Sequence, residues 1–408
     1  MKLFTALSAL CCMLMFAGGM VPEEYIMRID PVSPVPVRIA ALLPFSGREK
    51  QTAERLYEGL DFAAAEINAG RGINNKPFEF KKFDTRGSVS GAVEAVRQAA
   101  AWGACAVIAG IDTAEVRAII PHAVKNRMIV LLPATSDDKV REVSPFVYRV
   151  CYSDTQQAEA LMAYTYYWRQ AKTISVIIDP CEKGDYNRNL AAAVSKAMKQ
   201  FGGTVINTTM LPVKGTLADS DLAGAVQGMP DVIFVAAENK RAIAILKRLR
   251  ANGYRGFVCG PDNWNNDEFF SELKNFSSGE CFFPALASER SEYDEYRKFC
   301  RAFRKKLYYM PGMYECQAYD ALKFLAQSLN GIRDLEAFDL NWRAIRNHCG
   351  AATLYTMKPG GELDRMIYIN GIGVQSSSDG TKTFVPRELH KLLHSKIQEY
   401  SDNYFNVR

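Results

Sequence analysis

Short apolar runs alternate with amphipathic segments along most of this chain, and this alternation limits the fold more than any other feature. The run VRIAALLPF at 37–45 is bounded by Pro and Gly, and residues 51–69 then place Leu56, Leu60 and Ile67 at helical spacing. Further strands are expected at 78–84, 104–110, 127–134, 173–179, 204–210, 231–237 and 256–262. Helical patterns fall between them at 88–102, 114–125, 154–170, 187–201, 218–228 and 239–252. Apolar strands that alternate with helices indicate parallel sheets covered on both faces.

The strand and helix rhythm restarts after residue 134, and two more apolar helices are expected at 291–307 and 313–330. A length of 408 residues suits two or three domains, each with its own core. The sequence therefore predicts an α/β protein with two doubly wound parallel-sheet lobes.

The two ends of the chain depart from this rhythm. The Pro-rich lead within residues 21–36 predicts an extended linker. Residues 351–385 are expected to form β-hairpins, because turn-forming residues occur at 359–361 and 378–380. The polar tail at 386–408 is interpreted as an amphipathic helix with fraying ends.

Residues 1–20 have the order of a secretory signal, with Lys2 before an apolar run and small residues after it. The sequence therefore predicts export and a periplasmic or other extracytoplasmic location. A lipid anchor at Cys11 or Cys12 is an alternative that the sequence does not favour, because Leu10 stands where lipoprotein signals have a small residue.

Composition and motifs exclude several function classes. A formal charge of +5, from scattered basic residues, argues against a nucleic-acid partner. No nucleophile elbow, phosphate loop, metalloprotease motif or dinucleotide fingerprint occurs, so neither an enzyme nor a cofactor is expected. His390 and His394 are four residues apart on the predicted tail helix, but no third ligand accompanies them, so no metal site is expected.

In doubly wound sheets, ligands bind beyond the carboxyl ends of the strands, where loops lead into helix N-termini. Of the loops after the first, third and fourth strands, two offer hydroxyl and backbone N–H groups at a helix start, which suit a carboxylate. The corresponding loops of the second half offer acids and a tyrosine. The candidate ligand-binding residues are Ser46, Thr113, Ala134, Thr135, Ser136, Tyr186, Glu238 and Asp262.

Asp112 has two competing interpretations. As a ligand contact, it would place negative charge where a ligand carboxylate should lie, which costs about 1 kcal/mol or more. The segment Asp112-Thr-Ala-Glu115 is also a capping box, and this interpretation is favoured. If the cap were wrong, Asp112, Glu238 and Asp262 together would suit a basic or polyamine-like ligand.

At these residues the sequence resembles the type I periplasmic solute-binding proteins, in particular the branched-chain amino acid (Leu/Ile/Val) binding family of ABC transporters. The matching segments follow one another from about residue 37 to about residue 385. They are VRIAALLPFSG, EGLDFAAAEINAGRGINNKPFEF, AVIAGIDTAEVRAIIP, LLPATSDD, FVYRVCYSDTQQAEAL, DYNRNLAAAV, DVIFVAA, FVCGPD and YECQAYDALKFL. Their order and spacing are together specific, although no single one is diagnostic.

The resemblance implies two lobes that are joined by three crossings and close over a ligand. Lobe 1 would comprise 37–152 and 284–350, and lobe 2 would comprise 153–283 and 351–385. Thr113 and the Ala134–Ser136 loop would hold a ligand carboxylate, Tyr186 would close over the ligand, and Asp262 would hold its ammonium group. The chain departs from the family at Thr52 and Glu238, where some members have aromatic side chains, and at Asn187, where Gly is usual.

These observations predict an exported, monomeric solute-binding protein that captures an amino acid or a related amine and delivers it to an ABC permease. A sensor of the same fold, which reports ligand to a protein partner, is the alternative. Glu238 at the pocket wall favours polar or basic ligands over Leu, Ile and Val, because a buried unpaired carboxylate is costly. Glu238 turned outward, paired with Lys240 or Arg241, is the other interpretation.

Overall fold

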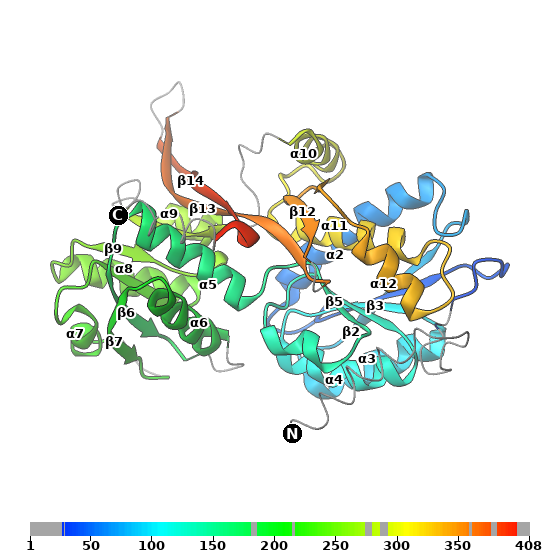
Figure 1. The fold of residues 1–408 in the computed structure, drawn as a ribbon, viewed down its shortest axis with the longest axis horizontal. Coiled ribbons are helices and arrows are strands. Elements are labelled where there is room, and N and C mark those ends of the chain that lie inside the picture. The colour runs from blue at the N-terminus through cyan, green and yellow to red at the C-terminus, as the bar shows by residue number, and fades with distance from the viewer. Residues whose placement is uncertain are drawn as a thin grey trace.

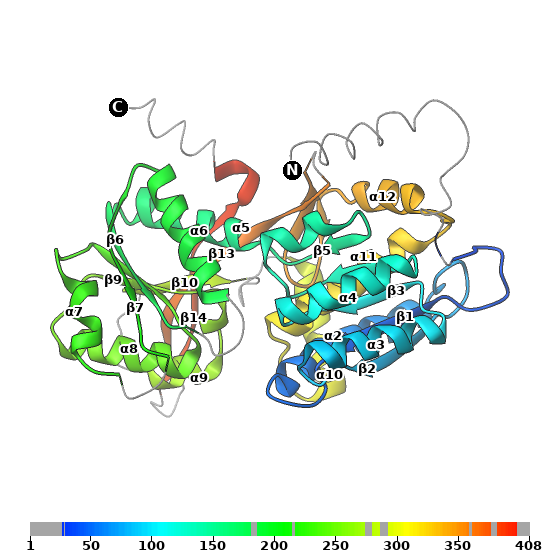
Figure 2. The ribbon, with the colours of Figure 1, turned by 90° about the horizontal axis from the view of Figure 1, so that it is seen from below.

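In a computed structural model, the chain forms two α/β halves, each built around its own sheet (Figures 1 and 2). The structure describes residues 27, 29–180, 186–213, 217–273, 280–285, 293–358, 361–376 and 382–397. The predicted signal at 1–20, with Cys11 and Cys12, lies outside these residues. In the described part of the chain, no helix has both the length and the apolar character needed to cross a bilayer.

The first sheet is wholly parallel and has five strands in the order β2-β1-β3-β4-β5. Its strands are β1 (Arg38–Leu43), β2 (Glu79–Asp84), β3 (Ala106–Ala109), β4 (Ile129–Leu132) and β5 (Val147–Arg149). The helices between them are α2 (Lys50–Ala69), α3 (Val89–Trp102) and α4 (Thr113–Lys125), followed by the 3-10 helix η3 (Asp138–Val143). Alternate residues of β1 point to opposite faces, so Ala40 and Leu42 pack with α3 and α4 while Ile39 and Leu43 pack with α2.

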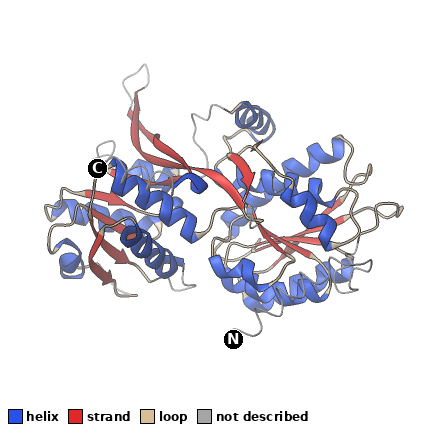
Figure 3. Cartoon of the chain, viewed as in Figure 1, coloured by secondary structure: helices blue, strands red, loops and turns tan. Residues whose placement is uncertain are grey.

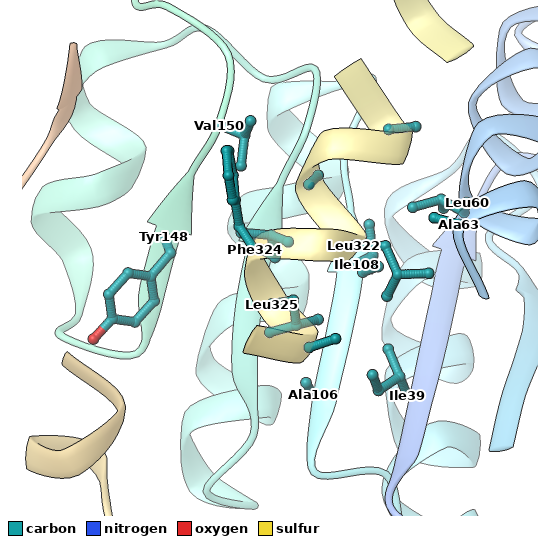
Figure 4. Packing of buried hydrophobic residues seen from close by; sticks show 14 of the residues in the cluster. Ile39, Leu60, Ala63, Ala106, Ile108, Tyr148, Val150, Leu322, Phe324 and Leu325 are labelled. Carbon is teal, nitrogen blue, oxygen red and sulfur yellow. The ribbon is translucent and has the colours of Figure 1, made fainter. Parts of the chain in front are cut away.

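Helices from late in the chain complete the core of the first sheet. These are α10 (Asp294–Leu307), α11 (Met313–Leu329) and α12 (Leu335–Arg343). Leu322 and Leu325 of α11 lie over the strands beside α2 (Figure 4). The two helices approach closely at Gly59, where an added Cβ would lie 2.2 Å from the carbonyl oxygen of Glu315.

The second sheet has a parallel half and an antiparallel half. Its order is β11-β12-β13-β10-β9-β8-β6-β7, and β14 pairs with β13. The parallel strands are β6 (Thr173–Ile178), β7 (Thr204–Met210), β8 (Val232–Ala236), β9 (Phe257–Cys259) and β10 (Cys281–Ala285). The antiparallel strands are β11 (His348–Cys349), β12 (Leu354–Met357), β13 (Leu363–Ser376) and β14 (Lys382–Leu393).

The helices of this half cover both faces of the second sheet. They are α5 (Asp154–Ala163), which continues into the π-turn η4 (Tyr164–Trp168), α6 (Tyr186–Gln200), α7 (Ser220–Val226), α8 (Asn239–Ala251) and α9 (Asp267–Glu272). Two 3-10 turns, η5 (Asp262–Trp264) and η6 (His394–Lys396), complete the described elements. Residues of α5 and α6 pack in one core cluster and residues of α7, α8 and α9 in another, on the opposite face. Figure 3 shows the helices around each set of strands.

The chain passes between the two halves three times. It leaves the first sheet after β5, returns after β10 to form α10, and crosses again along β13, the orange ribbon between the halves in Figure 1. Leu363 of β13 packs in the core of the first sheet, whereas Ile367 packs in the core of the second. The predicted fold class, two doubly wound lobes with a three-crossing hinge, is therefore confirmed.

The C-terminal part differs from the sequence prediction. Residues 386–393, expected to start a helix, continue strand β14, because each pairs with β13 or lies in its ladder. The predicted hairpins of 351–385 are confirmed by the antiparallel pairs β12/β13 and β13/β14. However, Tyr355 and Met357, which the resemblance assigned to the second lobe, pack in the core of the first sheet. The end of the predicted tail, from residue 398, lies outside the described residues.

At the other end, part of the predicted linker is packed against the first half. Met27 and Ile29 are buried in the core of the first sheet, and the N–H of Met27 donates to the carbonyl of Arg333 at 3.2 Å. The described part of the segment 21–36 is therefore not an extended linker throughout, since Met27 and Ile29 pack in the core of the first sheet.

Candidate functional site

A cavity of about 880 Å³ lies between the two halves. Its walls come from the start of α2 and of α11 on one side, and from the start of α8 and the η5–α9 segment on the other. Charged side chains of both signs line it: Arg48, Arg55, Lys240, Arg241, Glu49, Asp179, Glu238 and Glu268. The loops that follow β1, β6, β8 and β9 all reach this cavity, as the rule for doubly wound sheets predicts.

The three arginines among the described residues that line the cavity all have carboxylate partners. Arg48 Nη2 lies 2.6 Å from Glu238 Oε2, so this ion pair joins the loop after β1 to the N-cap of α8 across the two halves. Arg55 Nε lies 2.6 Å from Oε1 of the fully buried Glu315. The wall is therefore polar but largely charge-balanced.

Glu238 has a partner that the sequence did not suggest. It lines the cavity, as the pocket-wall interpretation predicted, but Arg48 from the other half pairs with it. Lys240 and Arg241, the outward partners that were considered, also line the cavity, and Arg241 Nε lies 3.3 Å from Asp179 Oδ1. An ion pair across the two halves depends on tertiary structure and leaves no sequence signal.

Asp262 is the first residue of η5, shortly after the end of β9, and its carboxylate accepts hydrogen bonds from two tyrosine hydroxyls. Tyr152 Oη donates to Oδ2 at 2.8 Å, and Tyr186 Oη donates to Oδ1 at 3.2 Å. Burial raises the pKa of Asp262, against the two tyrosine hydrogen bonds, which lower it. The negative charge of Asp262 in turn contributes to raising the pKa of Asp154 and that of Tyr314 in α11. The predicted residues Tyr186 and Asp262 are thus in direct contact.

The loop Ala134–Ser136 approaches the same region from the first half. The backbone N–H of Asp154 donates to the Ser136 carbonyl at 2.9 Å, and the Ser136 side chain is hydrogen-bonded to the Asp154 carboxyl. Thr135 is 2% exposed, and its Oγ1 has no hydrogen-bond partner in the described part of the chain. Gly110, after β3, faces this hydroxyl at a φ of +104°, and an added Cβ would lie 2.2 Å from Thr135 Oγ1.

Asp154 connects the two sets of predicted residues, and the sequence reasoning missed it. It is 3% exposed, and burial raises its pKa to about 7, with further contributions from the negative charges of Asp138, Asp137 and Asp262. The Ser153-x-x-Gln156 capping box that starts α5 is visible in the sequence. That signal places the acid at the start of a helix but does not bring it next to Ser136.

Ser46 and Thr113, two other predicted positions, follow strands β1 and β3 of the first sheet. Ser46 Oγ donates to Asp84 Oδ2 at 2.7 Å, which ties the loop after β1 to the end of β2. Thr113 is the first residue of α4, behind the N-cap Asp112, whose carboxylate accepts from the N–H groups of Ala114 and Glu115. The capping interpretation of Asp112 is confirmed.

The two tail histidines do not share a helix, so the basis for their i, i+4 pairing was wrong. His390 is in β14, and the centroid of its ring lies 4.2 Å from the ring centroid of Trp168. His394 Nε2 lies 2.6 Å from Glu159 Oε2. Across the described segments, no group of three His, Cys, Asp or Glu residues has the arrangement of a metal site.

Comparison with known proteins gives one consistent family. The sequence model described as periplasmic binding protein matches residues 36–358. A Leu/Ile/Val-binding protein homolog of Brucella melitensis is 23% identical over 240 residues, which cover 58% of this chain and 63% of that protein, just under two thirds of its length. The Leu/Ile/Val-binding protein of Escherichia coli is 21% identical over 302 residues, which cover 72% of this chain and 79% of the relative.

Solved structures share the fold. An ABC transporter substrate-binding protein of Sphaerobacter thermophilus superposes with a TM-score of 0.76 at 18% identity, covering 88% of this chain and 98% of its own. A leucine-binding protein of Thermotoga maritima gives 0.70 at 22% identity, covering 85% and 97%. Since the family match extends over most of the described fold, the chain belongs to the periplasmic binding protein family of solute-binding proteins.

Proposed function

We propose that this chain is exported, captures an amino acid or a related amine between its two lobes, and delivers it to an ABC permease. The observation that supports this most directly is the setting of Asp262. Its carboxylate is held by two neutral hydroxyls, Tyr152 and Tyr186, and has no cationic partner in the described part of the chain. A carboxylate that is partly desolvated and lacks a cation suits a ligand ammonium group.

The opposite end of the ligand would lie against the first half. Thr113, Ala134, Thr135 and Ser136 are the proposed carboxylate-binding residues, with Ser46 at the edge of the site. The buried Thr135 hydroxyl without a partner supports this assignment. Buried polar groups are normally hydrogen-bonded, so an orphan hydroxyl in the loop that follows β4 is a candidate ligand contact.

The ligand class follows from the charge balance of the cavity. Arg48 neutralises Glu238, so that acid no longer requires a second cation on the ligand. The polar wall still disfavours a purely apolar side chain, because closure would desolvate charged groups without new partners. Polar amino acids and related amines are therefore proposed to bind more tightly than Leu, Ile and Val.

A thermal-shift screen tests the ligand class. Its panel contains the twenty amino acids, polyamines and 3,4-dihydroxybenzoic acid, which is bound in the solved structure of a Rhodopseudomonas palustris neighbour. A ligand present at 100 times its dissociation constant stabilises by about 2.7 kcal/mol. Stabilisation by the aromatic acid but by no amine would overturn the proposal. If Leu gave the largest thermal shift, and Glu238→Gln left that shift unchanged, the proposed preference for polar side chains would be overturned.

Calorimetric titration tests the role of Asp262. Asp262→Asn is expected to weaken binding of the best amino acid by roughly 2–5 kcal/mol, the scale for removing one partner of a buried charged pair. Asp219→Asn is the matched control, because Asp219 is an exposed aspartate paired with Arg248 away from the cavity. Equal affinities for wild type and Asp262→Asn would remove Asp262 from the site.

Delivery is tested in cells. Growth on the identified ligand is expected to require both this protein and an ABC permease. Binding without such a requirement would instead favour the sensor alternative. Mass spectrometry of the mature chain tests export, since cleavage after residues 1–20 is expected.

A further inference from the structure

Arg365 is fully buried in β13, at the point where this strand crosses between the two halves. Its Nη1 donates to the carbonyl of Val150 at 2.8 Å, and Val150 belongs to the first crossing. Tyr355 is its register partner on β12, and Arg365 Nη2 reaches the hydroxyl of Tyr355 at 3.4 Å. One side chain thus ties two of the three crossings together.

Two tyrosine rings flank the guanidinium group. The Cζ atom of Arg365 lies 5.4 Å from the ring centroid of Tyr152 and 5.0 Å from that of Tyr355, within the range of a cation–π contact. Tyr355 is itself fixed, because its hydroxyl donates to the buried Asp320 at 3.0 Å. Tyr152 is the ring whose hydroxyl donates to Asp262.

A buried guanidinium group is costly. In the described part of the chain no carboxylate lies within ion-pair distance of Arg365, which is linked to the buried Asp320 through the Tyr355 hydroxyl. Burial raises the pKa of the Asp320 carboxyl, and the charge of Arg365 lowers it. In the same part of the chain, Arg365 Nε has no hydrogen-bond partner. The contacts that Arg365 does make are directed at backbone and aromatic groups of the hinge. Its placement is therefore better explained by orientation of those groups than by stabilisation through charge pairing.

We propose that Arg365 is a positioning residue that holds the Tyr152 ring so that its hydroxyl meets Asp262. Asp262 is the acid that takes the ligand ammonium in the proposed function, and the proposal for Arg365 rests on that function. Because Arg365 also bonds to Val150, it links the orientation of the ligand-binding acid in the second half to the geometry of the crossings.

The test follows the titration of Asp262 in the ligand-free full chain. Aspartate labelled with ¹³C at the carboxyl carbon gives one resonance for Asp262, assigned by its loss in Asp262→Asn. The hydrogen bond from Tyr152 lowers the pKa of Asp262, so Tyr152→Phe is expected to raise the titration midpoint. Arg365→Met is expected to raise it in the same direction, and the double variant is expected to match Tyr152→Phe alone.

Arg365→Lys separates positioning from simple charge. Lysine keeps the positive charge but lacks the planar, multiply donating guanidinium group, so the midpoint is expected to rise here too. This variant also decides the question if Arg365→Met does not fold. Arg250→Met is the matched control, because Arg250 also donates to two backbone carbonyls, those of Tyr254 and Gly256 at 2.8 Å, but from the last turn of α8 and not from a crossing.

Two results would overturn the role of Arg365. One is that the Asp262 titration midpoint in the Arg365 variants equals that of the wild type, while Tyr152→Phe raises it. The other is additive shifts of Arg365→Met and Tyr152→Phe, which indicate a direct charge effect. As a second readout, each single variant is expected to weaken binding of the best amino acid from the thermal screen about tenfold. If neither an amino acid nor an amine binds the wild type, the proposed function fails, and the ligand-free titration still decides the role of Arg365.

Discussion

The buried carboxyl group of Asp154 makes the stability of the protein depend on pH. Its pKa is about 7 in the folded protein, whereas an aspartate in an unfolded chain titrates near about 3.9. Between these values, the folded state holds a proton that the unfolded state has lost. The contribution of Asp154 to the free energy of unfolding is therefore fully present below about pH 4 and is lost as the pH rises through about 7.

The size of the effect follows from the two pKa values. Their difference corresponds to about 4 kcal/mol of penalty for the ionised form at pH 8. Asp154→Asn removes the ionisation and keeps an oxygen that accepts from the Ser136 side chain. We expect this variant to be more stable than the wild type by about 2–4 kcal/mol at pH 8, and the gain to vanish near pH 4.

Urea denaturation of the ligand-free protein between pH 4 and pH 8.5 measures this difference. Asp231→Asn is the control of opposite sign. Burial raises the pKa of Asp231, but hydrogen bonds from Thr173 and Lys172 lower it, and the net shift is downward. The ionised Asp231 therefore stabilises the folded protein at neutral pH, and Asp231→Asn is expected to lower the free energy of unfolding there. A stability difference between Asp154→Asn and wild type that does not change with pH would refute the reasoning.

Three further outcomes are expected. Saturation with a bound amino acid should reduce the radius of gyration in X-ray scattering, and an unchanged radius would count against closure of the lobes. Arg48→Gln should change the free energy of unfolding by less than about 1 kcal/mol, because both side chains of the Arg48–Glu238 pair are about half exposed, yet enlarge the ligand-free radius; a radius equal to that of the wild type would show that this pair does not hold the halves. Gly59→Ala should destabilise by about 1–3 kcal/mol, since its Cβ would meet the Glu315 backbone at 2.2 Å. Gly224→Ala, where the nearest atom is 3.4 Å away, is its control and should not destabilise; equal losses in both would contradict the close-approach argument.

The parallel strands and their helices follow from local sequence patterns. The apolar run at 37–45 became β1 (Arg38–Leu43), and the helical spacing of 51–69 became α2 (Lys50–Ala69). The cap of α4 at Asp112 was also readable, because Asp112 lies only two and three residues before the N–H groups that it accepts from, those of Ala114 and Glu115. Such features depend on neighbours in sequence, so the sequence is sufficient to predict them.

The C-terminal strand shows where local patterns failed. Residues 386–393 carry polar and apolar side chains at a spacing that also suits a helix, but pairing with β13 determines their conformation. A long antiparallel ladder satisfies the backbone groups of β14 through a partner strand, and this overrides local preference. Short elements such as β5 (Val147–Arg149) and α9 (Asp267–Glu272) were missed because they span too few residues to show a period.

By itself, the sequence determined the fold class and identified the loops that carry the candidate ligand-binding residues. Only the tertiary structure decided which side chains meet: Tyr152 with Asp262, Ser136 with Asp154, and Arg48 with Glu238. The physical reason is distance along the chain. A helix or strand forms from contacts a few residues apart, whereas the partners in each of these pairs come from different elements, and in two of the three they lie 110 or more residues apart. Their meeting depends on how the three crossings place one half of the molecule against the other.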